Sequence, residues 1–317
     1  MNAMPAFEFR RALPSDKEAV LALCAKIWEG GDYVPKAFDS WVADREGELA
    51  LCLESGRLVG LAKLSWLGPG EAWLEGLRKD PDAGVSGVGK ALCLRFLSRL
   101  AGVEGLRHLR FSTYIRNDAS IRLNEALGFR RIASASVKEL PGEALRDPAR
   151  LPRPERSALA EVVRDPAAVL AFVRASGWFG PYLHECWRSY PWSEEGFVER
   201  YVKPGRCLGL VEAGRLRALA AFLVHEEKGE GALAFFDAED WSSAAVLMGA
   251  VEDRLRAAGA PYADAIVPPG GGRARALLDA LGWRSWESEE DYLLYELPLE
   301  RLAAHRGPDG PPPAPNR

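Results

Sequence analysis

EGLRKDPDAGVSGVGKAL, residues Glu75 to Leu92, is the stretch that decides the fold. Its first residues are typical of a strand, and a helix is predicted from Lys90 to about Leu100. Between the two, Gly84, Gly87 and Gly89 let backbone N–H groups approach a ligand closely, and the helix N-terminus adds partial positive charge. The segment therefore predicts a site for a pyrophosphate, although a flexible turn shaped by packing would also explain these glycines.

Strand-like and helix-like pieces alternate on both sides of this loop. Strands are predicted at Phe7–Arg11, Glu48–Leu53, Leu58–Trp66, Glu71–Lys79 and His108–Tyr114, with a final strand pair after Phe129. A dinucleotide-binding fold would need the glycines after the first strand, whereas here they follow the fourth. A nucleotide P-loop would need Ser or Thr after Gly89-Lys90, and the chain has Ala91. Both alternatives fit poorly.

The second half repeats the order of the first, so the sequence predicts a duplicated domain. EALGF (Glu125–Phe129) and DALGW (Asp279–Trp283) fall at matching places in the two halves. A segment rich in Pro and Arg, LPGEALRDPARLPRP, separates them. We therefore predict a first domain over 1–140, a linker over 141–156, a second domain over 157–299 and a flexible tail over 300–317.

Composition excludes several functional classes. The 317 residues carry a formal net charge of -4, which gives no field to attract nucleic acid or an anionic membrane. The five cysteines are scattered, the four histidines show no metal-ligand spacing, and no signal peptide or membrane span is indicated. We therefore expect a cytoplasmic protein without a metal, as a monomer or homodimer.

Two motifs together resemble the GNAT family of acetyltransferases (GCN5-related N-acetyltransferases). Asp80-Pro81 followed by Gly84 to Gly89 resembles the family's central motif, and Asn117 to Phe129, ending in Leu-Gly-Phe, resembles the later one. The resemblance implies an α/β (α+β) fold of two tandem domains, each a twisted, mainly antiparallel mixed sheet flanked by helices. It also implies acetyl-CoA as cofactor, contacted by Leu77, Arg78, Lys79, Gly84, Val85, Ser86, Gly87, Val88, Gly89, Lys90, Asn117 and Ser120.

The chain departs from the family pattern at two positions. Gly84 stands where Arg or Gln is usual, so a side-chain role is lost while the phosphate-binding amides remain. Asn124 stands where many members have a Tyr that protonates the leaving thiolate. Tyr114 or Tyr33 would have to replace it, or the thiolate leaves without help.

Glu75 is the candidate general base, because carboxylates on this strand often have that role in the family. Alternation along the strand places Glu75 with Trp73 and Leu77, an otherwise apolar set in which a carboxyl pKa could be raised. An ordinary charged residue on the outer face of the sheet is the alternative. The backbone N–H of Leu77 or Arg78 is the expected oxyanion donor.

The acceptor site is expected at the turn between the first two helices, IWEGGDYVP. Glu29 and Asp32 could attract a cationic amine, and Trp28 and Tyr33 could form a face for it, unless these aromatics belong to the core. GGDYVP together with Glu75-Gly76-Leu77-Arg78 resembles the histidine N-acetyltransferase-like branch, which implies a small, amino-acid-like primary amine. Alternative interpretations are acetylation of a peptide or protein N-terminus or lysine, and a CoA-binding sensor without turnover.

The second half lacks the glycine loop. The segment in its place, Asp237 to Trp241, is acidic and would repel a pyrophosphate, and it suits the cap of the helix that follows. We expect a degenerate copy that closes the acceptor pocket, with His184, Trp187 and Tyr190 as candidates to reach it.

Overall fold

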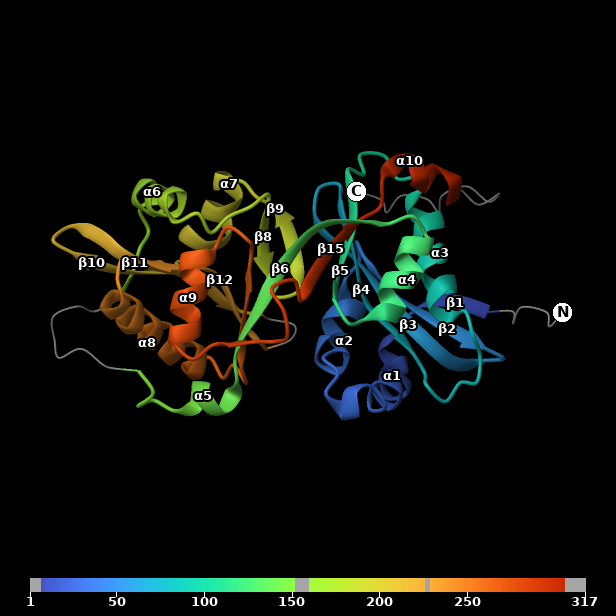
Figure 1. Ribbon diagram of the computed structural model, residues 1–317. Helices are drawn as coiled ribbons and strands as arrows, with labels where there is room; N and C mark the ends of the chain where they lie inside the picture. The colour runs from blue at the N-terminus through green and yellow to red at the C-terminus, as the bar shows by residue number, and fades with distance from the viewer. Residues whose placement is uncertain (1–6, 152–159, 226–228, 306–317) are drawn as a thin grey trace. The chain divides into compact units, whose positions relative to one another are not determined.

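The computed structural model describes residues 7–151, 160–225 and 229–305, and these fold into two compact units (Figure 1). The first unit holds the chain up to Ser112, residues 117–132 and the chain from Leu294; the second holds 113–116 and 133–293. This division differs from the boundaries predicted from sequence. Residues 133–140 of the predicted first domain belong to the second unit, and the chain from Leu294 belongs to the first unit.

The first unit is built on an antiparallel sheet that ends in one parallel pair. Strands β1 (Phe7–Arg11), β2 (Glu48–Glu54), β3 (Arg57–Gly68) and β4 (Glu71–Lys79) pair antiparallel in this order, and β5 (His108–Tyr114) runs parallel to β4. The C-terminal part of β15 (Tyr292–Glu296) continues this sheet, since Phe111 and Tyr295 stack at 5.1 Å and Leu297 N–H donates to Leu109 O at 2.9 Å.

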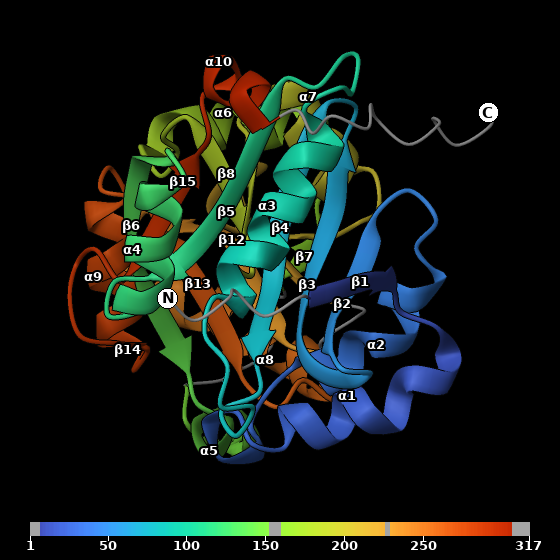
Figure 2. The same ribbon diagram turned by 90° about the vertical axis from the view of Figure 1, so that its right-hand side faces the viewer.

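Helices cover both faces of this sheet. Adjacent residues of a strand point to opposite faces, and Gly60 and Leu61 of β3 show which helix covers each one. A side chain at Gly60 would collide with Val88, the first residue of α3 (Val88–Leu100), while Leu61 packs in one cluster with Trp41 of α2 (Val34–Ala43). Helix α1 (Lys17–Cys24) packs in the same cluster as α2. On the other face, α3 crosses β3 and β4 (Figure 2). Helix α4 (Asp118–Ala126) follows β5.

The second unit repeats this plan. Strands β7 (Glu161–Val162), β10 (Cys207–Glu212), β11 (Arg215–Val224) and β12 (Gly231–Ala238) pair antiparallel, and β13 (Ala263–Val267) runs parallel to β12. Helix α8 (Trp241–Ala257) connects β12 to β13 as α3 connects β4 to β5. The remaining elements are α6 (Pro166–Ser176), the hairpin β8 (Tyr182–Glu185) and β9 (Arg188–Pro191), α7 (Glu194–Phe197), α9 (Gly272–Ala280) and β14 (Arg284–Ser285). The predicted α/β fold, in which a mainly antiparallel mixed sheet is flanked by helices, is confirmed.

Three local expectations from sequence are corrected. The strand pair expected after Phe129 is one strand, β6 (Arg130–Leu140), whose later residues pair with β13 in the second unit. The expected linker holds a short helix, α5 (Gly142–Arg146), while residues 152–159 lie outside the described chain. The expected tail begins as a helix, α10 (Leu299–Leu302), and 306–317 are outside the description.

Two general properties complete the description. Within the described ranges, every helix is too short or too polar to cross a membrane. Cys24, Cys52, Cys93, Cys186 and Cys207 are all buried free thiols.

The second unit contains a buried histidine whose titration predicts a pH effect on stability. His184 lies 7% exposed in β8, with Nδ1 2.8 Å from Ser189 Oγ, and burial lowers its pKa to about 3. The unfolded chain binds this proton near pH 6.5, so the free energy of unfolding falls as pH drops from about 6.5 toward 3. Between pH 7 and 4.5, the free energy of unfolding of His184→Gln should therefore fall by about 2–3 kcal/mol less than that of the wild type. Urea titrations at the two pH values measure this difference. His305→Gln is the control, and equal losses in all three proteins would contradict this assignment.

Candidate active site

A β-bulge interrupts β4 in the middle of the first unit. Leu61 pairs with Arg78 and Lys63 with Glu75, so Gly76 and Leu77 together face a single residue of β3. Gly76 has φ +63°, and a Cβ there would lie 2.6 Å from the Trp41 ring, so both conformation and space require glycine. A bulge withdraws a backbone N–H from the ladder, which makes it available to a ligand.

Strands β4 and β5 separate directly beyond their first residues. Among the described residues of the two strands, pairing is limited to Glu71–Trp73 of β4 with His108–Arg110 of β5. From Leu74 onward the β5-side edge of β4 therefore presents backbone groups to whatever lies between the strands. This edge leads from the bulge to the end of β4 at Lys79, where the glycine-rich loop begins (Figure 2).

The glycine-rich loop ends in an open helix N-terminus. Gly84 and Gly87 have φ +68° and +84°, and Gly87 is the N-cap of α3. No side chain in the described ranges accepts a hydrogen bond from the first amides of α3, which have no intrahelical partner either. The amides of Val88, Gly89 and Lys90 thus point into the space before the helix, as an anion site requires.

Asp80 fixes the start of this loop. Its carboxylate is 4% exposed and accepts from Lys26 Nζ at 2.9 Å, Arg57 Nη2 at 2.8 Å and Asp82 N–H at 3.0 Å. Burial alone would raise the pKa of Asp80, but these donors outweigh it and lower the pKa. The Asp-Pro step of the central motif therefore acts as an anchor for the loop.

The matching helix of the second unit is closed to anions. Asp240 is the N-cap of α8, and its carboxylate accepts from Ser243 N–H at 2.8 Å and Ser243 Oγ at 3.0 Å. These hydrogen bonds lower the pKa of Asp240, so a negative charge stands where an anion would bind. The predicted capping role of the acidic segment is confirmed.

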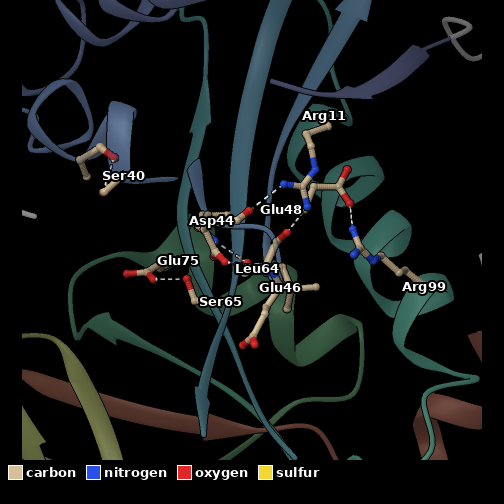
Figure 3. Close-up of polar contacts among 12 residues, drawn as sticks. Arg11, Ser40, Asp44, Glu46, Glu48, Leu64, Ser65, Glu75 and Arg99 are labelled. Carbon is tan, nitrogen blue, oxygen red and sulfur yellow. Dashed lines mark hydrogen bonds and ion pairs between the residues drawn. The ribbon is translucent and has the colours of Figure 1, made fainter. Parts of the chain in front are cut away.

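Glu75 lies beside the bulge on the face of the sheet covered by α2. Its Oε1 accepts from Ser65 Oγ at 2.7 Å (Figure 3). Trp73 shares this face, but the bulge breaks the predicted alternation, because Leu77 turns to the α3 face and lies 3.6 Å from a Cβ built on Gly89. The polar neighbours of Glu75 thus include Ser65 and Lys63, its partner in the β3–β4 register.

In the turn that is expected to form the acceptor wall, the charges are arranged differently from the expectation. Asp32 is 6% exposed and binds Arg78 through both carboxylate oxygens, at 2.8 and 2.9 Å. Both oxygens of Asp32 are therefore occupied by Arg78 and do not face an amine. Trp28 is 62% exposed, and Glu29 beside it is also exposed and remains the anionic candidate. Tyr33 packs edge-on against Trp41 at 5.9 Å.

The residues predicted on and before α4 have structural partners. Asn117 Oδ1 accepts from Ser120 N–H at 3.2 Å and caps α4. Asn124 is buried and donates to Ser120 O at 2.9 Å. Tyr114 belongs to the second unit by its contacts, and burial together with a hydrogen bond to Glu287 raises its pKa to about 12.

Two features of the site were not predicted from the sequence. The hydrogen bond from Ser65 to Glu75 depends on cross-strand register, and Ser65 carries no local signal. Arg78 is expected only as part of the cofactor strand, yet its side chain binds Asp32 and lies over the Trp28 ring. The Gly76 that allows the bulge was visible in EGLR, since a lone glycine inside a strand indicates a bulge.

Comparison with known proteins finds a family that matches part of the chain. The Acetyltransferase (GNAT) family matches residues 17–129. The chain is similar to histidine N-acetyltransferase of Xenopus tropicalis, with 29% identity over 136 residues, or 41% of this chain and 40% of that protein. Histidine N-acetyltransferase of Oreochromis niloticus is 32% identical over 94 residues, 29% of this chain and 28% of that protein. The matched part thus spans at most 40% of the length of these relatives.

Solved structures share the fold over nearly the whole chain. A GCN5-related N-acetyltransferase from Sphaerobacter thermophilus has a TM-score of 0.63 at 17% identity and covers 94% of this chain and 97% of its own. A tandem GNAT protein from the clavulanic acid biosynthesis pathway has a TM-score of 0.60 at 17% identity, covering 92% and 98%. At these identities the likeness shows the fold alone.

Proposed function

Residues 17–129 are an acetyltransferase domain of the GNAT family, and from this premise we propose that the protein transfers an acetyl group from acetyl-CoA to a primary amine. The observation that carries the proposal is the sequence of features along β4: a carboxylate at Glu75, a bulge at Gly76, an unpaired edge to Lys79 and then an uncapped helix N-terminus. Together they form one continuous site in the first unit.

The chain's residues fit acetyl-CoA at this site. The amides of Val85 to Lys90 would hold the pyrophosphate, and the unpaired edge of Leu77 to Lys79 would bind the amides of the pantetheine arm. Gly84 and Gly87 leave open space above the loop, because a Cβ on either would meet nothing within 4 Å. Acetyl-CoA supplies a thioester, whose acyl group passes to the amine while the thiolate departs.

Three groups of the chain would promote this transfer. Glu75 accepts the proton of the ammonium acceptor, directly or through water, and Ser65 holds the carboxylate in place. The N–H released by the bulge, at Leu77 or Arg78, donates to the carbonyl oxygen as negative charge develops there. The second unit, with Asp240 at its helix cap, has no equivalent role in holding the donor.

The acceptor class follows from the relatives and from the wall of the site. We propose a small, amino-acid-like amine, with histidine as a member of the class because the relatives are named for it. Trp28 and Tyr33 supply aromatic faces and Glu29 an exposed charge near them. The five free cysteines agree with a cytoplasmic location, which we also propose.

A thiol-release assay with acetyl-CoA tests the proposal. The panel contains free amino acids, polyamines, aminoglycosides and short peptides, and product masses identify the acetylated atom. Turnover of free amino acids supports the proposal. Turnover restricted to peptides would replace it with a peptide acetyltransferase, and acetyl-CoA binding without any product would replace it with a sensor.

Tyr114→Phe should lower kcat less than about threefold. The hydroxyl of Tyr114 is already bound to Glu287. Its pKa of about 12 means that it gives up its proton reluctantly, which makes it a poor acid for the leaving thiolate. We therefore propose that the thiolate leaves without a side-chain acid. Steady-state kinetics at pH 7 to 10 checks this, and a loss of tenfold or more would assign the acid role to Tyr114.

A further inference from the structure

Arg78 is held in a single orientation in the first unit. Its Nε and Nη2 donate to the two oxygens of Asp32 at 2.8 and 2.9 Å, and Nη1 donates to Leu77 O at 3.0 Å. The Asp32 side chain is fully buried and also accepts from Val34 N–H at 3.1 Å. Burial lowers the pKa of Arg78, but Asp32 outweighs it and raises the pKa, so the guanidinium remains a fixed cation.

The fixed guanidinium still has donors to offer. Arginine carries five N–H groups, and three are used by Asp32 and Leu77. Within the described part of the chain, one N–H on Nη1 and one on Nη2 have no such acceptor. Because Nε and Nη2 bind Asp32 side-on, the remaining N–H of Nη2 points to the end of the fork, beside Nη1, and arginine binds carboxylates through this edge. The Arg78 side chain is 10% exposed, so solvent reaches it.

Aromatic side chains connect Arg78 to the reacting part of the site. Its Cζ lies 4.3 Å from the centre of the Trp28 ring and 5.3 Å from that of Tyr33. Tyr33 packs against Trp41, and Trp41 lies against Gly76 at the bulge. Arg78 and Glu75 therefore lie on the same face of β4, the face covered by α2.

The loop above Arg78 is strained. Trp28 and Glu29 are consecutive non-glycine residues with φ +46° and +55°, a conformation that side chains rarely adopt. The Trp28 indole is largely exposed and lies over the guanidinium. Such strain is typical of ligand-binding segments.

We infer that Arg78 binds the carboxylate of the acceptor, so that the enzyme selects α-amino acids over amines that lack a carboxylate. The inference rests on the proposed function and names a specificity residue for it. Asp32 then acts as the positioning residue that aims Arg78. The sequence predicts that Asp32 attracts the amine of the acceptor. In the structure Asp32 binds Arg78, whose remaining donors would bind the carboxylate of the acceptor instead.

Paired substrates test this inference on the wild-type protein. Histidine with histamine, tyrosine with tyramine and lysine with cadaverine differ in each case by the carboxylate alone. We expect kcat/KM to favour the amino acid by at least about 100-fold in whichever pair is turned over, because a site built for a polar group strongly rejects the analogue that lacks it.

Variants then assign the preference to Arg78. Arg78→Gln alone leaves Asp32 buried without a partner, so Asp32→Leu/Arg78→Met is the principal variant, as a neutral replacement of the pair. In this variant the ratio of kcat/KM for the amino acid to kcat/KM for the amine should fall at least about 30-fold, mostly because KM for the amino acid rises. The KM for acetyl-CoA is the internal control. Circular dichroism verifies folding.

The outcomes are distinguishable. Wild-type turnover of histamine, tyramine or cadaverine equal to that of the amino acid overturns the inference and leaves the acetyltransferase proposal standing. An equal fall for both members of a pair in the double variant makes Arg78 a purely structural residue. Absence of thiol release with every amine overturns the proposed function itself.

Discussion

Replacing Glu75 by glutamine lowers kcat by about 100-fold or more while leaving acetyl-CoA binding intact. The glutamine side chain has nearly the same shape as glutamate, and its carbonyl oxygen still accepts the hydrogen bond that Ser65 donates to Glu75 at 2.7 Å. The change removes the proton acceptor and little else. Stopped-flow or steady-state thiol release measures kcat, and calorimetry measures the affinity for acetyl-CoA.

Glu46→Gln is the matched control for this experiment. Glu46 is an exposed carboxylate of the same unit and is labelled together with Glu75 in Figure 3. We expect its kcat to stay within about twofold of the wild type, as for a surface substitution outside the site. If Glu75→Gln behaved like Glu46→Gln, the amine would be deprotonated by another group or by solvent, and Glu75 would be an ordinary polar residue of the sheet.

The second large effect is expected from Gly87→Asp. An aspartate at this N-cap brings a carboxylate to the first turn of α3, as Asp240 does at α8, although Gly87 has φ +84° and Asp240 has φ -147°. The new carboxylate would occupy the first amides of α3 and repel a pyrophosphate, so the Kd for acetyl-CoA should rise at least about 100-fold. A side chain at φ +84° also strains the backbone, so the loss of affinity is judged against the equally strained Gly87→Asn.

Gly87→Asn separates charge from shape. Gly87 has φ +84°, and asparagine tolerates a left-handed conformation about as well as aspartate does. The neutral amide still competes for the amides of α3 but does not repel phosphate. We expect a loss of affinity well below that of Gly87→Asp. Equal affinities for the two variants would show that the anion does not bind at this helix.

Much of the site could be predicted from local sequence. The glycines at 84, 87 and 89 predict an open helix N-terminus. Gly84 and Gly87 adopt φ above 0°, which few other residues do, and Gly89 lies in the first turn of α3. The acids before α8 predict a capped helix by the same reasoning, and the repeated Leu-Gly-aromatic ends of α4 and α9 predict the duplication. Each of these signals lies within a few residues of the feature that it determines.

The features that could not be predicted depend on partners distant in the sequence. The pair of Asp32 and Arg78 joins residues 46 positions apart, and local sequence assigns one to an amine and the other to the cofactor. The placement of β15 beside β5 joins positions near 295 and 111, and nothing in either strand specifies its neighbour. The orientation of Leu77 depended on a bulge, which reverses the face of every residue after it.

Titration of acetyl-CoA into the full-length protein by isothermal calorimetry tests the central claim most directly. The account predicts one binding site per chain, located in the first unit and lost in Gly87→Asp. Absence of binding, or binding that Gly87→Asp leaves unchanged, would contradict the assignment of the Gly84 to Gly89 loop as the site of the acetyl donor.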